Sequence, residues 1–362
     1  MAVYKIFASA DATLYSAYPN QNTGLDEILE VGCKNAQIPS GVANSADDIR
    51  RAVVLFSNED LATGVNLASE VGGTYFVSFR LYFANAENLN TTYDLFVAPL
   101  TENWDMGTGK FLDSPEIKNG VSWKNKTENV AWTSPTDPYI TAGGGAWDNA
   151  LILSQSFGYK DSKDLNIGSL YTIVSKWVDN QIPNYGLIVK MSGSIEENSG
   201  SYIDLSFFSV DTHTIYPPTL EFKWDDSSYS TGSLSVVSNN NTIITIPNNP
   251  NVFKNDTGKY VFSVNARDKF PARQFTTSSV YLVNKALPSS SYWAIQDVKT
   301  EEMVIDFDTN YTKISCNANG SYFPIYMNGL EPERYYKILI KVDLPDGESI
   351  DIDGHNIFKI TR

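Results

Sequence analysis

The sequence contains few of the residues that most often carry chemistry. Among its 362 residues there are two cysteines, Cys33 and Cys316, and two histidines, His213 and His355. Structural zinc needs four ligands at close spacing, and no Cys or His pair lies within CxxC or HxxxH distance. Because the two cysteines also fall in different predicted domains, we expect two ordinary buried or half-buried thiols rather than a disulfide or a metal centre.

Long apolar runs and an excess of basic charge are also missing. No stretch approaches the roughly 18 apolar residues of a membrane span, and the first residues lack the basic start and apolar core of a signal peptide. We therefore expect synthesis in a cytoplasm, with no membrane partner. The formal net charge of −15 and the isoelectric point near 4.6 argue against nucleic acid as a partner, because nucleic acid needs a basic face.

Motifs for catalysis and phosphate binding are absent as well. The chain has no GxSxG, no GxxxxGK(S/T) and no GxGxxG after a predicted strand. A Ser-His-carboxylate triad would need His213 or His355, and both lie beside turn residues. A pair of carboxylates could serve a glycosidase, but nothing singles out one pair among 42 acidic residues, so we expect a solvated acidic surface and no enzyme activity.

Aromatic and β-branched segments dominate what is present. Aromatic residues make up 13% of the chain, with 21 Tyr and 18 Phe, a composition typical of antiparallel β-proteins. Short alternating or apolar segments bounded by Gly, Asn, Asp or Pro predict strands. They cover residues 52–56, 75–83, 93–100, 185–191, 242–246, 259–264, 303–307 and 335–342. One segment, 170–178, has its apolar residues at helical spacing and predicts a short helix.

Charge divides the chain into two parts. Residues 1–229 carry 14 Lys+Arg and 28 Asp+Glu, whereas residues 230–362 carry 13 and 14. A polar run at 224–233 is typical of a linker, so we place the domain boundary near residue 229. The second part has the size of one immunoglobulin-like β-sandwich. Its Asp-Gly pairs at Asp346 and Asp353 predict a closing hairpin, and their clustered oxygens leave calcium binding open.

Residues 104–150 interrupt the strand pattern with four tryptophans: Trp104, Trp123, Trp132 and Trp147. We interpret the segment as a long insertion, with Gly143-Gly-Gly as its most flexible point. Trp104 and Trp123, like Trp177 in the predicted helix, are expected to be structural. Trp132, Trp147 and the nearby Tyr139 are the candidates for contact with a partner subunit or a glycan, because aromatic rings serve both purposes.

Six pieces of the first 225 residues follow one another in a recognisable order. They are Asp11-Ala-Thr-Leu with Pro19-Asn-Gln-Asn and Leu29-Glu-Val-Gly, Arg50-Arg-Ala-Val-Val-Leu-Phe-Ser, Val77-Ser-Phe-Arg-Leu-Tyr-Phe, Glu102-Asn-Trp with Val121-Ser-Trp-Lys-Asn, residues 170–178 with 184–190, and Pro217-Pro-Thr-Leu-Glu-Phe-Lys-Trp. In this order they resemble the DNRLRE-type β-sandwich domain, a carbohydrate-binding-like jelly roll. The resemblance implies a jelly-roll β-sandwich over residues 1–229, with loops lengthened at 34–48, 57–73 and 104–150.

The resemblance also carries an expectation about function. Domains of this kind occur in exported bacterial surface proteins and in phage structural proteins, and expected cytoplasmic synthesis favours the latter. We therefore expect a non-enzymatic structural component of a tailed-phage virion, at the neck or tail, present in several copies and bound to other virion proteins. The alternative is a carbohydrate-binding adhesin that recognises host surface glycans. A polysaccharide-degrading enzyme has little support.

Overall fold

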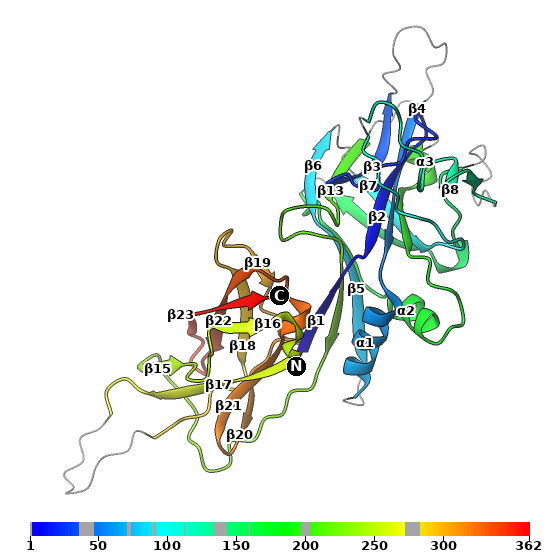
Figure 1. The fold of residues 1–362 in the computed structure, drawn as a ribbon. Helices are drawn as coiled ribbons and strands as arrows, with labels where there is room; N and C mark the ends of the chain where they lie inside the picture. Colours follow the sequence, from blue (N-terminus) through cyan, green and yellow to red (C-terminus); the bar gives the residue numbers. More distant parts are fainter. Residues whose placement is uncertain are drawn as a thin grey trace, which may run out of the picture. The chain divides into compact units, whose positions relative to one another are not determined.

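The fold is built mainly from β-strands, with few helices (Figure 1). The computed structural model describes residues 2–35, 47–70, 74–87, 89, 92–111, 113–133, 143–158, 160–196, 203–271 and 283–362. The described residues form two compact units, one made of Ile6–Leu67 and Phe76–Glu221, the other of Met1–Lys5, Ala68–Tyr75 and Phe222–Arg362. The prediction of an all-β protein is confirmed. The boundary near residue 229 and the finer jelly-roll and immunoglobulin-like assignments stay predictions.

The unit that contains Ile6–Leu67 and Phe76–Glu221, which we call the large unit, is centred on an eight-stranded sheet. Its order is β10-β7-β12-β4-β3-β13-β6, with β2 also paired to β4. These strands are β2 (Ala10–Tyr15), β3 (Ile28–Asn35), β4 (Asp47–Leu55), β6 (Phe83–Glu87), β7 (Thr92–Pro99), β10 (Leu153–Gly158), β12 (Leu187–Met191) and β13 (Ile203–Phe208).

A second sheet has the order β1-β14-β5-β11, and a small one joins β8 to β9. Their strands are β1 (Ala2–Phe7), β14 (Thr219–Trp224), β5 (Tyr75–Leu81), β11 (Leu165–Ile167), β8 (Asn125–Thr127) and β9 (Val130–Ala131). The alternation predicted for residues 75–83 places Val77, Phe79 and Leu81 at 0% exposure, as expected for a strand with one face in a core. The strand itself ends at Leu81, and Phe83 begins β6.

The structure contains more helix than the sequence led us to expect. The predicted short helix is confirmed as α2 (Tyr171–Val178), with Trp177 buried. A longer helix, α1 (Asn58–Ser69), lies where we expected a lengthened loop. Its start is fixed by Ser57, whose hydroxyl accepts the backbone N–H of Asp60 at 3.1 Å, a common N-terminal cap. The remaining helical turns are α3 (Gly193–Glu196), η1 (Asn149–Leu151), η2 (Asn255–Thr257) and η3 (Met327–Gly329).

The other unit, which we call the small unit, contains two sheets of four and five strands. The first has the order β15 (Thr242–Thr245), β17 (Lys259–Asp268), β21 (Gly320–Tyr326), β20 (Ser315–Asn317). The second has the order β16 (Val252–Lys254), β23 (Ser349–Thr361), β22 (Arg334–Asp343), β18 (Ser291–Asp297), β19 (Met303–Ile305).

Stacked aromatic rings join the two sheets of the small unit. Phe323 of β21 stacks on Phe262 of β17 at 5.5 Å and on Trp293 of β18 at 5.6 Å between ring centroids. All three side chains are fully buried within an apolar cluster. Because Trp293 belongs to the five-stranded sheet and the two Phe to the four-stranded one, the cluster is the core of a β-sandwich.

The closing hairpin forms at only one of its two predicted Asp-Gly turns. Strands β22 and β23 are joined through Asp346 and Gly347, where Gly347 has a φ of +89°. Asp353 and Gly354 instead lie inside β23, opposite a register shift between Ile338 and Ile340. This pair forms an irregularity in a long strand, because β23 continues to Thr361 and pairs with β22 on both sides of it. Within the described part of the chain, no helix is long and apolar enough to span a membrane.

Candidate functional site

The tryptophans of the insertion lie inside the large unit. Trp132 and Trp147 have 7% and 4% of their surface exposed, and they share an apolar cluster with Trp104 and Trp123. The Trp132 indole N–H donates to the Ser122 carbonyl at 3.1 Å. Contact of these two rings with a partner stays a prediction, but each ring has an internal structural role and shows little surface. Tyr139, the third candidate, lies outside the described residues.

A buried cation holds the insertion against the sheet. Arg51 of β4 is fully buried, and its guanidinium donates to both carboxylate oxygens of Glu196, at 3.1 and 2.8 Å. It also donates to the Gly144 carbonyl at 2.9 Å. The guanidinium carbon lies 5.0 Å from the ring centroids of both Trp123 and Trp147. These cation–π contacts and hydrogen bonds fix the insertion to strand β4.

The three glycines of the insertion are buried and closely packed in this arrangement, at the place where we expected a flexible point. Gly143, Gly144 and Gly145 are buried, with φ values of +132°, +78° and +96°. A Cβ atom on Gly144 would lie 2.7 Å from the Arg51 guanidinium and 2.8 Å from the Trp123 ring. Glycine is required here because the backbone takes a left-handed conformation and touches side chains closely.

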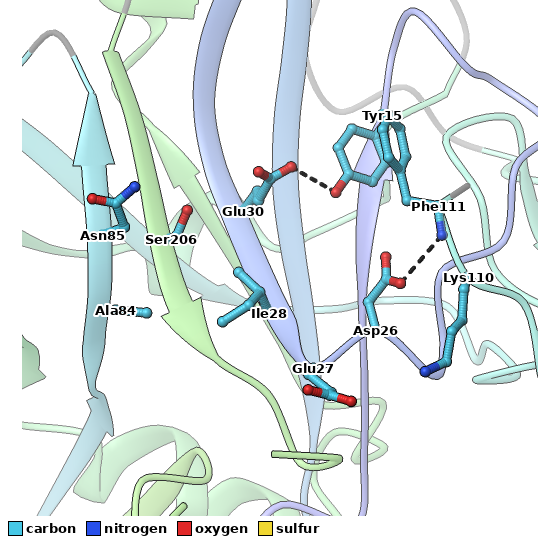
Figure 2. Close-up of a pocket in the computed structure, with 10 residues that line it drawn as sticks. All are labelled: Tyr15, Asp26, Glu27, Ile28, Glu30, Ala84, Asn85, Lys110, Phe111 and Ser206. Atoms are coloured by element: carbon cyan, nitrogen blue, oxygen red, sulfur yellow. Dashed lines mark hydrogen bonds between the residues drawn. The ribbon is translucent and has the colours of Figure 1, made fainter. Parts of the chain in front are cut away.

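A pocket of about 530 Å³ opens elsewhere on the large unit (Figure 2). Its lining comes from β2, β3, β6, β13 and the segments before β3 and around residue 110, and comprises Tyr15, Asp26, Glu27, Ile28, Glu30, Ala84, Asn85, Lys110, Phe111 and Ser206. Strand register explains one wall. Ser206 of β13 pairs with Glu30 of β3 on one side and with Asn85 of β6 on the other. Directly paired residues project from the same face of a sheet, so these three polar side chains form a row.

Tyr15 and Phe111 form the aromatic side of the pocket. Their ring centroids are 4.5 Å apart, and Tyr18 packs edge-on against Phe111 at 5.1 Å. The Tyr15 hydroxyl donates to Glu30 at 2.7 Å, as Figure 2 shows. Burial and the neighbouring Glu30 charge raise the pKa of Tyr15 well above its usual value. Tyr15 therefore remains a protonated hydrogen-bond donor.

Glu30 is the most heavily engaged carboxylate of the pocket. Besides the Tyr15 hydroxyl, it accepts a hydrogen bond from Arg50 at 2.7 Å. Arg50 in turn contacts Asp48 at 2.8 Å and lies over the Tyr15 ring at 5.1 Å. This network fixes Glu30 in one place and compensates its charge.

Asp26 is the carboxylate with the most altered chemistry in the pocket. One of its oxygens accepts the Phe111 backbone N–H at 3.2 Å. Burial raises the pKa of Asp26 to about 6; the Phe111 hydrogen bond opposes this rise, and the charge of Glu30 adds to it. A carboxyl group of this kind can change its charge near neutral pH.

The segment around residue 110 is held in place by a buried asparagine. Asn22 is fully buried, and its side-chain oxygen accepts the Gly109 backbone N–H at 2.8 Å. Its amide group donates to the carbonyls of Met106 and Val121 at 2.7 and 2.8 Å. The Phe111 wall is thus positioned by hydrogen bonds before any ligand arrives. Sequence reasoning missed the whole pocket, because its residues lie as far apart as Tyr15 and Ser206.

The other residues considered for chemistry are not brought together. His213 and His355 are exposed. Cys33 and Cys316 are buried free thiols, as predicted. In the hairpin proposed for calcium, Asp353 contacts Lys337 at 2.8 Å. Across the described ranges, no group of three or more His, Cys, Asp or Glu side chains is placed to hold a metal ion.

Comparison with known proteins adds no assignment. No family model matches the chain, and a search of curated proteins finds no match. The resemblance to the DNRLRE-type domain therefore stays a prediction from the sequence.

Proposed function

We propose that this chain is a non-enzymatic structural component of a tailed-phage virion, at the neck or tail, that acts through assembly with other virion proteins. The observation that carries the proposal is the way the large unit uses its buried charges. Arg51 and Glu196 are placed under Trp123 and Trp147, where they fix a long insertion to the sheet. Such an arrangement suits a body that must keep one shape in many identical copies.

The acidic surface is compatible with this role. A net charge of −15 keeps free copies apart and soluble until they meet their partners. Contacts with partner proteins in the particle would then form at specific patches of matching shape, which favours defined positions of the chain over random association.

Quantitative mass spectrometry of density-purified particles tests the proposal. We expect the protein at a fixed ratio to the major capsid protein, with a copy number that is a multiple of the symmetry of the neck or tail. An abundant host protein carried through the same gradient provides the contamination control. If the chain falls to the level of that control, the virion proposal is wrong.

In the alternative, a glycan-binding adhesin, we expect Trp132, Trp147 and Tyr139 to contact the sugar. The burial of Trp132 and Trp147 gives those rings little surface for stacking on a sugar. The feature that favours glycan binding is instead the pocket of Figure 2, with its aromatic and polar lining.

A further inference from the structure

The pocket combines an aromatic surface with uncommitted polar side chains. Phe111 and Ile28 give it apolar lining, and both are partly exposed. Asn85 and Ser206 face the same space, and within the described part of the chain their side chains have no hydrogen-bond partner. A few convergent polar groups beside an apolar surface are the usual make-up of a small-molecule site, and about 530 Å³ is within the usual range.

The polar groups lie at positions suited to hydroxyl groups. An amide at Asn85 both donates and accepts, a hydroxyl at Ser206 does the same, and the Asp26 carboxylate accepts. A ring that carries several hydroxyls on its edge and C–H groups on its face matches this set, because its face can pack on Phe111 while its edge meets the polar row.

Charge narrows the class of ligand. The lining contains three carboxylates, Asp26, Glu27 and Glu30, against one cation, Lys110. Arg50 compensates Glu30 and is also engaged with Asp48, so Asp26 and Glu27 remain with Lys110 as the one cation of the lining. An anionic ligand would approach carboxylates with little compensation, so the charge balance disfavours uronic and sialic acids.

The aromatic side of the pocket is also preorganised. Tyr15 and Glu30 are fixed by their mutual hydrogen bond and by Arg50, and the Phe111 segment is fixed through Asn22. Binding to groups that are already in place costs little ordering entropy.

We propose that this pocket binds a neutral hexose unit of a glycan, with the sugar face on Phe111 and its hydroxyls at Asp26, Ser206 and Asn85. The site is distinct from Trp132 and Trp147. It does not rest on the virion proposal, since a sugar site would serve a particle component and a free protein equally.

The test measures saturation transfer by NMR from the full chain to the methyl glycosides of glucose, galactose and mannose, with methyl glucuronide as the charged counterpart. We expect transfer to at least one neutral glycoside and much weaker transfer to the glucuronide. No transfer to any of the three neutral glycosides would overturn the proposal. Equal transfer to the glucuronide would overturn the charge argument and with it the assigned class.

Variants then locate the binding. Asn85→Ala and Phe111→Ala should each weaken the affinity for the bound glycoside by about fivefold or more, as the loss of one hydrogen bond or one stacking surface would. Asn66→Ala is the matched control, because Asn66 is exposed on α1 and outside the pocket lining. If the pocket variants bind as the wild type does while remaining folded by circular dichroism, the sugar binds elsewhere and the proposal is wrong.

Discussion

The interiors of the two units are stabilised by different kinds of interaction. The small unit joins its sheets through stacked aromatic rings, with Phe323 between Phe262 and Trp293. The large unit places a fully buried ion pair, Arg51 with Glu196, next to its tryptophans. Apolar burial is favourable wherever the area is covered, whereas a buried ion pair is tolerable only while both partners are present. Replacing one member of this buried pair should therefore lower the stability of the large unit strongly.

Removal of the buried carboxylate should have the largest effect. Glu196→Gln leaves Arg51 and Lys190, whose ammonium lies 3.1 Å from Glu196, without their anion. We expect a loss of about 3–5 kcal/mol in the unfolding free energy of the large unit, because an uncompensated charge stays buried. Urea unfolding gives the loss, and hydrogen exchange with mass spectrometry should place it in the large unit.

The double variant Arg51→Met/Glu196→Met sharpens the same comparison. Replacing both members of the pair removes the isolated charge on Arg51, whereas Lys190 lacks its anion in both variants, so the double variant should be more stable than Glu196→Gln. If the double variant is no better than the single one, the loss comes from disturbed packing around Trp123 and Trp147 and our account of the pair is wrong.

The next largest effect concerns a buried carboxyl group whose partner is the backbone. Asp11 of β2 is 1% exposed and accepts the Val210 N–H at 2.7 Å. Burial raises the pKa of Asp11 to about 8, and the nearby Asp211 adds to the shift. Because the folded pKa lies above the unfolded one, the contribution of Asp11 to stability is complete below about pH 4 and is lost as the pH rises to about 8.

Asp11→Asn should remove this pH dependence. The new amide oxygen can still accept the Val210 N–H, so at pH 9 the variant should exceed the wild type by about 2–4 kcal/mol. Urea unfolding at pH 5 and pH 9 measures the difference. Asp353 of the small unit should show the opposite pH dependence of stability. Its pKa is lowered by the Lys337 hydrogen bond, so its contribution to stability is present above about pH 4 and is lost as the pH falls. Equal pH slopes for Asp11→Asn and the wild type would contradict the account.

In the small unit, a substitution in the aromatic core should lower the unfolding free energy by less. Phe323→Leu keeps an apolar side chain but loses the stacked ring and leaves a small cavity, for an expected cost of about 1–2 kcal/mol. Tyr335→Leu on β22, where the ring is 55% exposed, is the control and should change stability little. A cost for Phe323→Leu as large as that of Glu196→Gln would remove the contrast between the units.

The contrast also marks what the sequence could predict. Periodicity predicted the all-β class and α2, because apolar spacing along one segment decides which face is buried. It missed α1, although Ser57 followed by Asp60 carries a helix-start signal. It misinterpreted Gly143-Gly-Gly, since a glycine that allows close approach and a glycine that allows motion look identical in a sequence.

The pocket lay beyond sequence reasoning for a different reason. Glu30, Asn85 and Ser206 meet only through the pairing of β3, β13 and β6, and their register is set by contacts far apart in the chain. Asn22, which fixes the Phe111 segment, belongs to Pro19-Asn-Gln-Asn of the resemblance, but the sequence does not show which distant backbone groups its side chain binds. Strand order and register were the missing information.

The smallest effect should come from an ion pair with nearly the same geometry as the buried one. Lys359 and Glu333 of the small unit lie 2.7 Å apart, close to the 2.8 Å of Arg51 and Glu196, but their side chains are 26% and 50% exposed. Water and salt screen this pair, so Lys359→Gln should change the unfolding free energy very little, and less still at high salt. Urea unfolding at two salt concentrations measures it beside Glu196→Gln. Similar losses for the two variants would mean that distance governs these pairs; a much smaller loss for Lys359→Gln, as expected, would mean that burial does.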